Sequence, residues 1–263
     1  MDKKDILTAE SVHYRIGEVS IIKDCSLKLD EGLFYGIIGP NGSGKTTLLD
    51  LLCDYRKYHT GEICLYGKPL NSYSKRDIAR HIALVPQSFD IPFPFTVSDV
   101  IKMGRHPYIK RFSSFSKSDK ALVDEVVGEL ELGDFLDRDF TTLSGGERQR
   151  VIFARALVQN TDIIFLDEAT SNLDPFYCHS LLITINKWVR EKKKTVLSVF
   201  HELNLASLYC DELFMMKDGK VKRAGRTGQI MTEENMKDIF RIESEIIQDS
   251  HKGKPFVMTR GII

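Results

Sequence analysis

The chain has 263 residues, a length that can bury a full hydrophobic core and that lies near the upper limit of a single domain. Its 37 Lys and Arg residues are matched by 37 Asp and Glu residues, so the formal net charge is zero. A chain without an overall positive field is not built to hold a polyanion, so we expect no nucleic-acid partner.

Hydropathy and cysteine usage point to a protein of the cytoplasm. No stretch approaches the roughly 18 consecutive apolar residues that a membrane-spanning helix needs. The start of the chain, Met1 to Asp5, leads into no apolar segment of the kind that a secretory signal contains. The five cysteines are odd in number and form no C-x-x-C pair, which is typical of reduced thiols.

The first half of the chain predicts short strands followed by a helical region. Apolar and polar residues alternate in the first thirty residues, which predicts half-buried strands, and the apolar run Leu33–Ile38 predicts a buried one. A helix is expected from Lys45 to about Cys53. After a strand-like segment at 82–86, a Pro-rich stretch from 91 to 95 leads into helical patterns over Val97–Met103 and Lys117–Leu132.

The second half alternates helix and strand. Ser144-Gly145-Gly146 is expected to open a helix that runs to about Gln159, and another is expected from about Pro175 to Lys192, with strands at Asp162–Leu166 and Thr195–Phe200. This alternation predicts a mostly parallel sheet with helices on its faces. No internal repeat or low-complexity linker divides the chain, so we expect one domain over residues 1–263.

Residues 39–46, Gly-Pro-Asn-Gly-Ser-Gly-Lys-Thr, match the pattern G-x-x-x-x-G-K-[ST] between an expected strand and an expected helix. Glycines let such a loop wrap so that its backbone N–H groups and the helix N-terminus point at a phosphate. Lys45 would add positive charge at the β- and γ-phosphates, and Thr46 a hydroxyl for Mg²⁺. A glycine-rich turn is the alternative, and the strand–loop–helix context favours a nucleotide loop.

The strand Asp162–Leu166 ends in two acids, Asp167 and Glu168. Many buried strands end in a polar turn, so the pattern is weak alone and gains meaning beside a phosphate loop. There Asp167 would hold Mg²⁺, directly or through water, and Glu168 would polarise the attacking water.

A second glycine-containing helix start occurs at residues 143–150, Leu-Ser-Gly-Gly-Glu-Arg-Gln-Arg. Its small residues would allow a ligand to approach a helix N-terminus, which favours anions. An ordinary N-capped helix after a glycine turn explains the segment equally well.

Taken in order, the phosphate loop, Gln87, Leu-Ser-Gly-Gly-Glu at 143–147, Asp167-Glu168, Asp174 and His201 resemble the nucleotide-binding domains of ABC transporters. The resemblance spans nearly the whole chain. It implies an ATPase with an α/β fold, namely a P-loop NTPase with a RecA-like core, an N-terminal antiparallel β subdomain and an α-helical insert at about 89–150. A C-terminal extension would cover about 218–263.

The same resemblance implies a homodimer in which each ATP lies between the phosphate loop of one chain and Ser144-Gly145-Gly146 of the other. Gln87 would sense Mg²⁺ and the attacking water, His201 would contact the γ-phosphate, and Asp174 would lie at the dimer seam. Tyr14 would stack on adenine. The full nucleotide-contacting set would be Tyr14, Gly39, Pro40, Asn41, Gly42, Ser43, Gly44, Lys45, Thr46, Thr47, Ser144, Gly145, Gly146 and Asp174.

Each of these four assignments has a simpler alternative that the residues alone leave open. Gln87 fits an exposed loop, His201 a structural strand end, Asp174 a helix N-cap and Tyr14 the core. The sequence also departs from the family at two positions. Ala169 stands where the family usually has Pro, and Asn172 replaces a small residue.

The segment Thr96–Tyr108 is similar to importer ATPases for iron–siderophore, haem and cobalamin. This implies a peripheral subunit at the cytoplasmic face of the membrane that drives a separate permease and, indirectly, serves a solute-binding protein. Phe93, Phe95 and Val97 are expected to receive a permease helix. The alternatives are another importer type, such as one for zinc or manganese, a soluble ABC ATPase acting on DNA or the ribosome, and a regulatory module.

Overall fold

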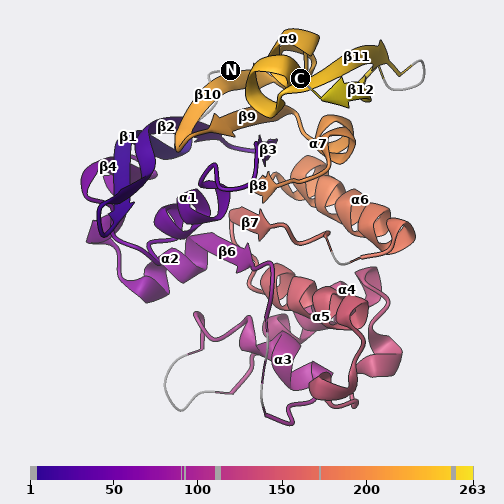
Figure 1. Cartoon of the computed structure of the whole chain (residues 1–263). Helices are drawn as coiled ribbons and strands as arrows, with labels where there is room; N and C mark the ends of the chain where they lie inside the picture. The colour runs from indigo at the N-terminus through magenta and orange to yellow at the C-terminus, as the bar shows by residue number, and fades with distance from the viewer. Residues whose placement is uncertain are drawn as a thin grey trace.

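A computed structural model describes residues 5–89, 91, 93–109, 114–171, 173–249 and 253–262. Residues 1–4, Pro92 and Asn172, on which some of the sequence interpretation rested, lie outside the described residues. Figure 1 shows two β-sheets and a group of helices below them, with a short β-hairpin near the C-terminus.

The N-terminal part forms a four-stranded antiparallel sheet in the order β2-β1-β4-β5. The strands are longer than the short ones expected, because β1 and β2 each run for 12 residues with several register shifts between them. Their bounds are β1 Asp5–Ile16, β2 Val19–Asp30, β4 Thr60–Leu65 and β5 Lys68–Pro69.

A six-stranded sheet in the order β10-β9-β3-β8-β7-β6 forms the centre of the molecule. Neighbouring strands in this sheet run parallel to each other, except β9 and β10, which are antiparallel. This confirms the mostly parallel sheet expected from the sequence. The bounds are β3 Phe34–Ile38, β6 Ile82–Val85, β7 Ile163–Asp167, β8 Thr195–Val199, β9 Glu212–Lys217 and β10 Lys220–Arg226.

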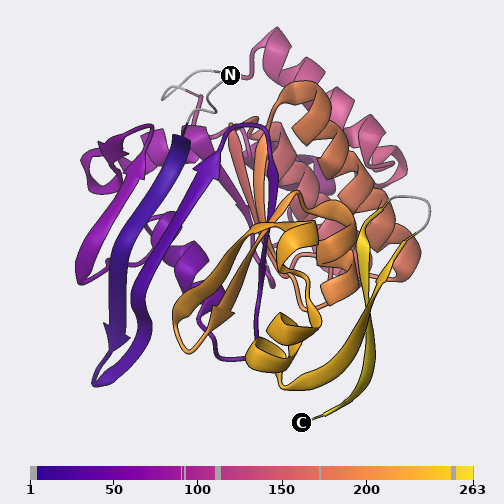
Figure 2. The same cartoon turned by 90° about the horizontal axis from the view of Figure 1, so that it is seen from above.

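Strands β3, β7 and β8 of the central sheet are buried on both faces, which explains their continuous apolar runs. On β3, Tyr35 and Ile37 face a core shared with α1 and the antiparallel sheet, whereas Phe34 and Ile38 face the helices on the other side. Figure 2 shows the antiparallel sheet on one side of the central sheet and α6 on the other. The helices of this part are α1 Lys45–Leu52, α2 Lys75–His81, α6 Pro175–Lys192 and α7 Leu203–Tyr209.

The helical insert contains α3 (Val97–Met103), α4 (Lys117–Glu129) and α5 (Gly145–Val158). Each begins with a capping box, at Thr96, Ser116 and Ser144 respectively. In each box the N-cap side chain accepts from the backbone N–H three residues later, and the side chain of that later residue accepts from the N-cap N–H. The bounds of α3 match the sequence prediction. Helix α4 ends three residues earlier than expected, because Glu131 turns left-handed with φ 51°.

The C-terminal segment has structure that the sequence analysis did not assign. After α8 (Thr227–Ile230), α9 (Glu233–Asn235) and a π-helical turn (Met236–Phe240), a hairpin of β11 (Ile242–Gln248) and β12 (Pro255–Ile262) closes the described chain. The Asn204 amide of α7 bonds both backbone groups of Val257, at 2.8 and 3.2 Å, and so fixes β12 to the core. Within the described residues, no helix is both long and apolar enough to cross a membrane.

Candidate active site

The loop between β3 and α1 has a backbone that only glycine accommodates at several positions. A Cβ atom on Gly39 would lie 2.2 Å from the Met216 carbonyl oxygen. Gly42 and Gly44 have φ angles of 76° and 99°, in the left-handed region that disfavours side chains. The loop therefore wraps tightly, as the glycine pattern predicted, and Gly44 caps the start of α1.

Two side chains of this loop, those of Lys45 and Ser43, have polar atoms that can still form hydrogen bonds with a ligand. Lys45 is only 5% exposed, and its ammonium donates to the carbonyl oxygens of Gly39 and Pro40 at 2.9 and 3.2 Å. Burial lowers the pKa of Lys45, an effect opposed by the nearby carboxylates of Glu168 and Asp167. The buried hydroxyl of Ser43 has no hydrogen-bond partner among the described residues. A phosphate group would satisfy both.

Thr46 and Asp167 meet although 121 residues separate them in the sequence. The Thr46 hydroxyl donates to Asp167 Oδ1 at 3.0 Å, which joins the start of α1 to the end of β7. Burial raises the pKa of Asp167 to about 6, with the Thr46 hydrogen bond acting in the opposite direction. Mg²⁺ that is bound to phosphate groups prefers hard oxygen ligands, and the Thr46 hydroxyl and the Asp167 carboxylate are two such ligands.

Glu168 lies next to these residues and is held from both sides. Its Oε2 accepts a hydrogen bond from the Gln87 amide at 2.5 Å, and its Oε1 lies 2.5 Å from His201 Nε2. Its backbone is left-handed, with φ 51°, which costs a non-glycine residue about 1–3 kcal/mol. The structure thus brings together the three residues Gln87, Glu168 and His201 that the sequence analysis assigned to water and γ-phosphate.

A cavity of about 480 Å³ lies over the phosphate loop. Among the residues that line it are Asn41, Gly42, Gly44, Lys45, Thr46, Thr47, Gln87, Glu168 and His201. Ile21 of β2 also lines it, a residue that the sequence analysis missed because nothing in its strand pattern marks it. Nine of the predicted site residues therefore face one space large enough for a triphosphate.

Tyr14 lies outside the lining of this cavity. Its half-buried ring contacts His59, with ring centroids 5.7 Å apart, and its hydroxyl accepts a hydrogen bond from Arg56 at 3.2 Å. Arg56 in turn forms an ion pair, at 2.7 Å, with Asp50 of α1, the helix that follows the phosphate loop. The adenine contact of Tyr14 stays a prediction.

Ser144 and Asp174 serve as N-caps within the chain. Ser144 Oγ accepts from the Glu147 N–H at 3.3 Å, and the Glu147 carboxylate accepts from the Ser144 N–H at 2.8 Å. Asp174 accepts from the Tyr177 N–H at 3.2 Å. Neither these two residues nor Gly145 and Gly146 line the cavity over the phosphate loop. Within one chain, the two parts of the expected composite site, the phosphate loop and Ser144-Gly145-Gly146, therefore do not share this cavity.

The donors fit a magnesium nucleotide. Ser43 has an unsatisfied buried hydroxyl, Lys45 an ammonium bound only to carbonyl oxygens, and Thr46 and Asp167 offer hydroxyl and carboxylate oxygens. In the described part of the chain, no group of three His, Cys, Asp or Glu side chains gathers into a metal site of its own. A metal here would complete its shell with phosphate oxygens and water.

Comparison with known proteins agrees with this geometry. A family model described as ABC transporter matches residues 22–171. The chain is 32% identical to the iron(3+)-hydroxamate import ATP-binding protein FhuC of Bacillus subtilis, over 98% of this chain and 96% of that protein. It is 34% identical to the hemin import ATP-binding protein HmuV of Pseudomonas fluorescens, over 97% and 100%. It is also 37% identical to the uncharacterized ABC transporter ATP-binding protein YvrA of Bacillus subtilis, of which it spans 57%.

Solved structures show the same fold. One, assigned to the metal-chelate type of ABC transporter and captured in an inward-facing conformation, superposes with a TM-score of 0.83 at 26% identity, covering 98% of both chains. A bacterial ABC transporter cassette solved as a dimer superposes with a TM-score of 0.75 at 29% identity, covering 84% of this chain and 98% of that one.

Proposed function

Because the chain belongs to the family of ABC transporter ATP-binding subunits, we propose that it powers the uptake of a metal-chelate nutrient through a separate membrane permease. It is an ATP-binding ATPase of this family. The import of an iron–siderophore, haem or cobalamin is supported by relatives named for hydroxamate and hemin import and by the metal-chelate type of the superposed transporter. A solute-binding protein would deliver the chelate, and this subunit would lie at the cytoplasmic face of the membrane.

The chemistry rests on one observation: Lys45, Thr46 and Glu168 line a single cavity, and Asp167 is hydrogen-bonded to Thr46 beside it. Lys45 exchanges its two carbonyl contacts for phosphate oxygens and neutralises the charge that develops there. Glu168 accepts the proton of the attacking water. Gln87 orients that water, and His201 contacts the γ-phosphate.

Mg²⁺, held by Thr46 and Asp167, supplies further neutralisation of phosphate charge when it is bound. Both oxygens of Glu168 are already engaged by Gln87 and His201. Each carboxylate oxygen has a further lone pair, so a water molecule can still donate a hydrogen bond to Glu168 while Gln87 and His201 hold the carboxylate in place.

The working form is a dimer with two composite sites. Ser144, Gly145 and Gly146 lie away from the cavity of their own chain, so they are placed to serve a second chain. The dimeric cassette that shares this fold supports the same assembly. The γ-phosphate would favour closure, because Ser144 and the N-terminus of α5 attract negative charge.

The dimer is tested with the variant Glu168→Gln, which should bind Mg-ATP and hydrolyse it about a hundredfold or more slowly, since an amide accepts no proton. The variant should form a dimer with ATP and remain monomeric with ADP, as measured by light scattering. Full parental ATPase activity from a demonstrated monomer would refute the composite site.

The cargo is tested by deleting the gene in its native host and measuring uptake of labelled iron–hydroxamate, haem, cobalamin, zinc and manganese. We expect the loss of one chelate only, restored by the parental gene and not by Glu168→Gln. Loss of zinc or manganese uptake instead would assign the subunit to another importer type.

A further inference from the structure

Strands β9 and β10 are joined by a two-residue turn, Asp218-Gly219, because Lys217 pairs directly with Lys220. Both turn residues have left-handed backbones, with φ angles of 53° and 79°. Positive φ angles at both positions are those of a type I′ turn, which favours Asp-Gly in β-hairpins. Connections of this kind usually run over the surface, but Gly219 is buried. Other parts of the chain therefore cover the tip of this hairpin.

The covering elements are the phosphate loop and β2. Strand β9 lies parallel to β3, so the segments that follow the two strands leave the same edge of the central sheet. The Gly219 N–H donates a hydrogen bond to the carbonyl oxygen of Ser43 at 3.2 Å. The Gly219 carbonyl oxygen accepts another from the N–H of Lys23 at 2.8 Å. One residue thus bridges the phosphate loop and β2, the strand whose Ile21 lines the cavity over this loop.

Glycine allows these segments to pack main chain against main chain. A Cβ atom on Gly219 would lie 2.3 Å from the carbonyl oxygen of Ile21. One on Gly39, at the start of the phosphate loop, would lie 2.2 Å from the carbonyl oxygen of Met216 in β9. Cβ atoms do not approach backbone oxygens this closely, so a side chain at either position would push the segments apart.

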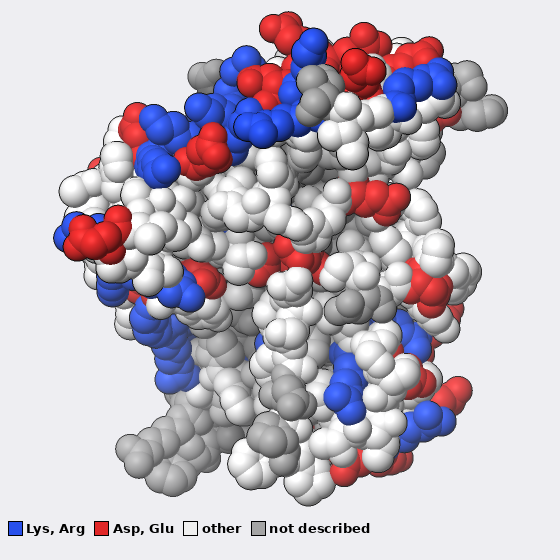
Figure 3. All heavy atoms as spheres, in the orientation of Figure 1, with Lys and Arg blue, Asp and Glu red and all other residues white. Residues whose placement is uncertain are grey.

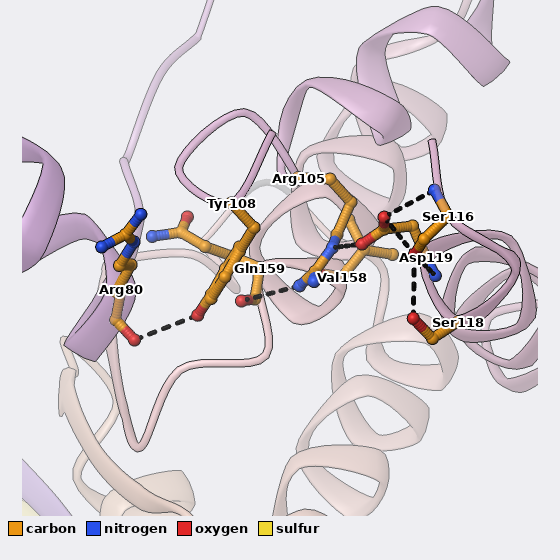
Figure 4. Close-up of polar contacts among 8 residues, drawn as sticks. All are labelled: Arg80, Arg105, Tyr108, Ser116, Ser118, Asp119, Val158 and Gln159. Atoms are coloured by element: carbon orange, nitrogen blue, oxygen red, sulfur yellow. Dashed lines mark hydrogen bonds and ion pairs between the residues drawn. The ribbon is translucent and has the colours of Figure 1, made fainter. Parts of the chain in front are cut away.

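The junction at Gly219 differs from one that side chains hold. Figure 4 shows a junction of the second kind, in which Arg105 donates to the carboxylate of Asp119 at 2.7 Å and to the carbonyl oxygen of Val158 at 2.9 Å. There each contact can be removed by shortening a side chain. At Gly219 the backbone makes the contacts, so the informative change is to add a Cβ atom.

The hydrogen bond to Ser43 also fixes the direction of a peptide group in the phosphate loop. The peptide bond between Ser43 and Gly44 is trans, so its carbonyl oxygen and its N–H point in opposite directions. Because the carbonyl oxygen faces Gly219, the N–H of Gly44 faces away from the turn. Gly44 lines the cavity over the phosphate loop. Backbone N–H groups that point into a cavity of this kind bind phosphate oxygens.

We propose that Gly219 is a positioning residue of the ATPase, which holds the Ser43–Gly44 peptide so that the Gly44 N–H meets a phosphate group of the nucleotide. Gly219 acts through the backbone from behind the loop, because it is not among the residues that line the cavity. Its second hydrogen bond, from Lys23, holds β2 and therefore Ile21 at a fixed distance from the loop. The inference rests on the assignment of this cavity to a magnesium nucleotide.

Charge is a second way in which the same hairpin could favour a nucleotide. Figure 3 shows Lys and Arg side chains gathered over β10 and β2, and those of β10 are Lys220, Lys222, Arg223 and Arg226. Three of them, Lys222, Arg223 and Arg226, are exposed, so salt screens them over about 8 Å at physiological ionic strength. This explanation predicts that removing cations weakens nucleotide binding, and that a change at Gly219 without a change in charge does not.

The test adds a Cβ atom at Gly219 and at a matched control position. Gly67 is the second residue of the Tyr66-Gly67 turn between β4 and β5, where the φ angles are 51° and 72°. A Cβ atom on Gly67 would meet nothing within 4 Å. Asn is the suitable replacement, because it adopts a left-handed backbone more readily than most residues with a side chain. Gly219→Asn and Gly67→Asn therefore carry similar local strain, and only the first displaces the phosphate loop.

In steady-state assays with Mg-ATP, Gly219→Asn should raise KM about tenfold or more, the effect of losing one hydrogen bond to a charged group. Its kcat should stay within about twofold, since a contact made equally to bound substrate and transition state changes KM alone. The affinity for inorganic tripolyphosphate, which has no base or ribose, should fall by a similar factor. Gly67→Asn and the double variant Lys222→Gln/Arg226→Gln should match the parent in all three measurements.

An unchanged KM for Gly219→Asn, or a KM that rises only when the cations are removed, would overturn the proposal. A fall in kcat with an unchanged KM would do the same, because the turn would then act on the reaction and not on phosphate binding. A parental chain that binds neither Mg-ATP nor tripolyphosphate would refute the nucleotide site itself. Parental binding without any effect at Gly219 would refute only the positioning role.

Amide hydrogen exchange in the parental protein gives a second test, which holds even if Gly219→Asn does not fold. The Gly219 N–H should exchange slowly, because it is buried and bonded to Ser43, and more slowly still when Mg-ATP is bound. Exchange at the rate of a free peptide in the presence of Mg-ATP would refute the contact on which the proposal depends.

Discussion

Asp167 should be a source of instability in the nucleotide-free protein. It is 7% exposed, and burial raises the pKa of its carboxyl to about 6. Above this pH the carboxylate is ionised in surroundings that disfavour the charge. Replacing it with Asn keeps the shape and the ability to accept the Thr46 hydrogen bond at 3.0 Å, while it removes the charge. We expect Asp167→Asn to stabilise the metal-free protein.

The magnitude follows from linkage between protonation and folding. The ordinary pKa of Asp is about 3.9, so the difference is about two pH units, and one unit corresponds to about 1.4 kcal/mol. Asp167→Asn should therefore raise the free energy of unfolding by about 2–3 kcal/mol at pH 8. Because the folded protein holds this proton more tightly than the unfolded one, the gain should be complete above pH ~6 and vanish below pH ~4. For a domain of this size, it corresponds to roughly 5–10 °C in the melting temperature.

The assay is thermal and urea unfolding of both proteins in EDTA across this pH range. Subtracting the unfolding free energies of the two proteins cancels the contribution of the other carboxylates to the pH dependence. Asp124→Asn, an exposed change on α4, serves as the control and should show no difference. With Mg-ATP the parent should become the more stable of the two proteins, since the ligand stabilises it by mass action and Asn at position 167 holds Mg²⁺ less well. Equal stability of parent and variant at pH 8, or a gain that grows toward acidic pH, would refute this reasoning.

Three further changes test other parts of the molecule. Lys45→Ala should weaken ATP binding and turnover at least tenfold by loss of a charge-assisted phosphate contact, and calorimetry and ATPase rates within twofold of the parent would contradict the assignment. Phe95→Asp, at a residue 38% exposed, should uncouple uptake in cells while basal ATPase activity persists, and normal uptake would exclude this segment from docking. Gly104→Ala should lower stability by about 1–3 kcal/mol through overpacking, whereas Gly128→Ala, where a Cβ would meet nothing within 4 Å, should not lower it.

The regular elements were predictable where local chemistry and burial agree. Val97–Met103 and Pro175–Lys192 carry clear caps, Thr96 and Asp174, and both helices have the bounds expected from the sequence. The five residues of β3 are all buried, so its apolar run was unambiguous. Val97, however, was wrongly expected on the docking surface. As the first residue of α3 it is 0% exposed and packs in the core.

Other features depend on contacts between distant segments and left no local trace. The hairpin of β11 and β12 contains no apolar run that marks it in the sequence, since most of its residues are exposed or half-buried. The sequence assigned Thr46 and Asp167 to Mg²⁺, from the phosphate-loop pattern and from the acids at a strand end, but their direct hydrogen bond could not be predicted, because no spacing rule links residues 121 positions apart. The position of the Arg155 guanidinium over the ring of Phe89, 4.1 Å from the ring centroid, is another contact of this kind.

The two halves of the composite site differ in how they are held, and this difference bears on how the cycle is driven. At the phosphate loop, Lys45 and Asp167 are buried at a cost, the Ser43 hydroxyl is unsatisfied, and Glu168 has a left-handed backbone. Phosphate oxygens would accept hydrogen bonds from Lys45 and Ser43, and a magnesium ion would offset the charge of Asp167, so the chain itself favours the binding of a magnesium nucleotide there. At Ser144 the capping box already satisfies the N–H groups of Ser144 and Glu147, and these two groups gain little from a second chain alone. In the proposed dimer, closure would require an anion at the interface that Ser144 and the helix N-terminus can contact in addition to the cap. The γ-phosphate would provide this anion, and its removal by hydrolysis would remove the attraction between the two surfaces.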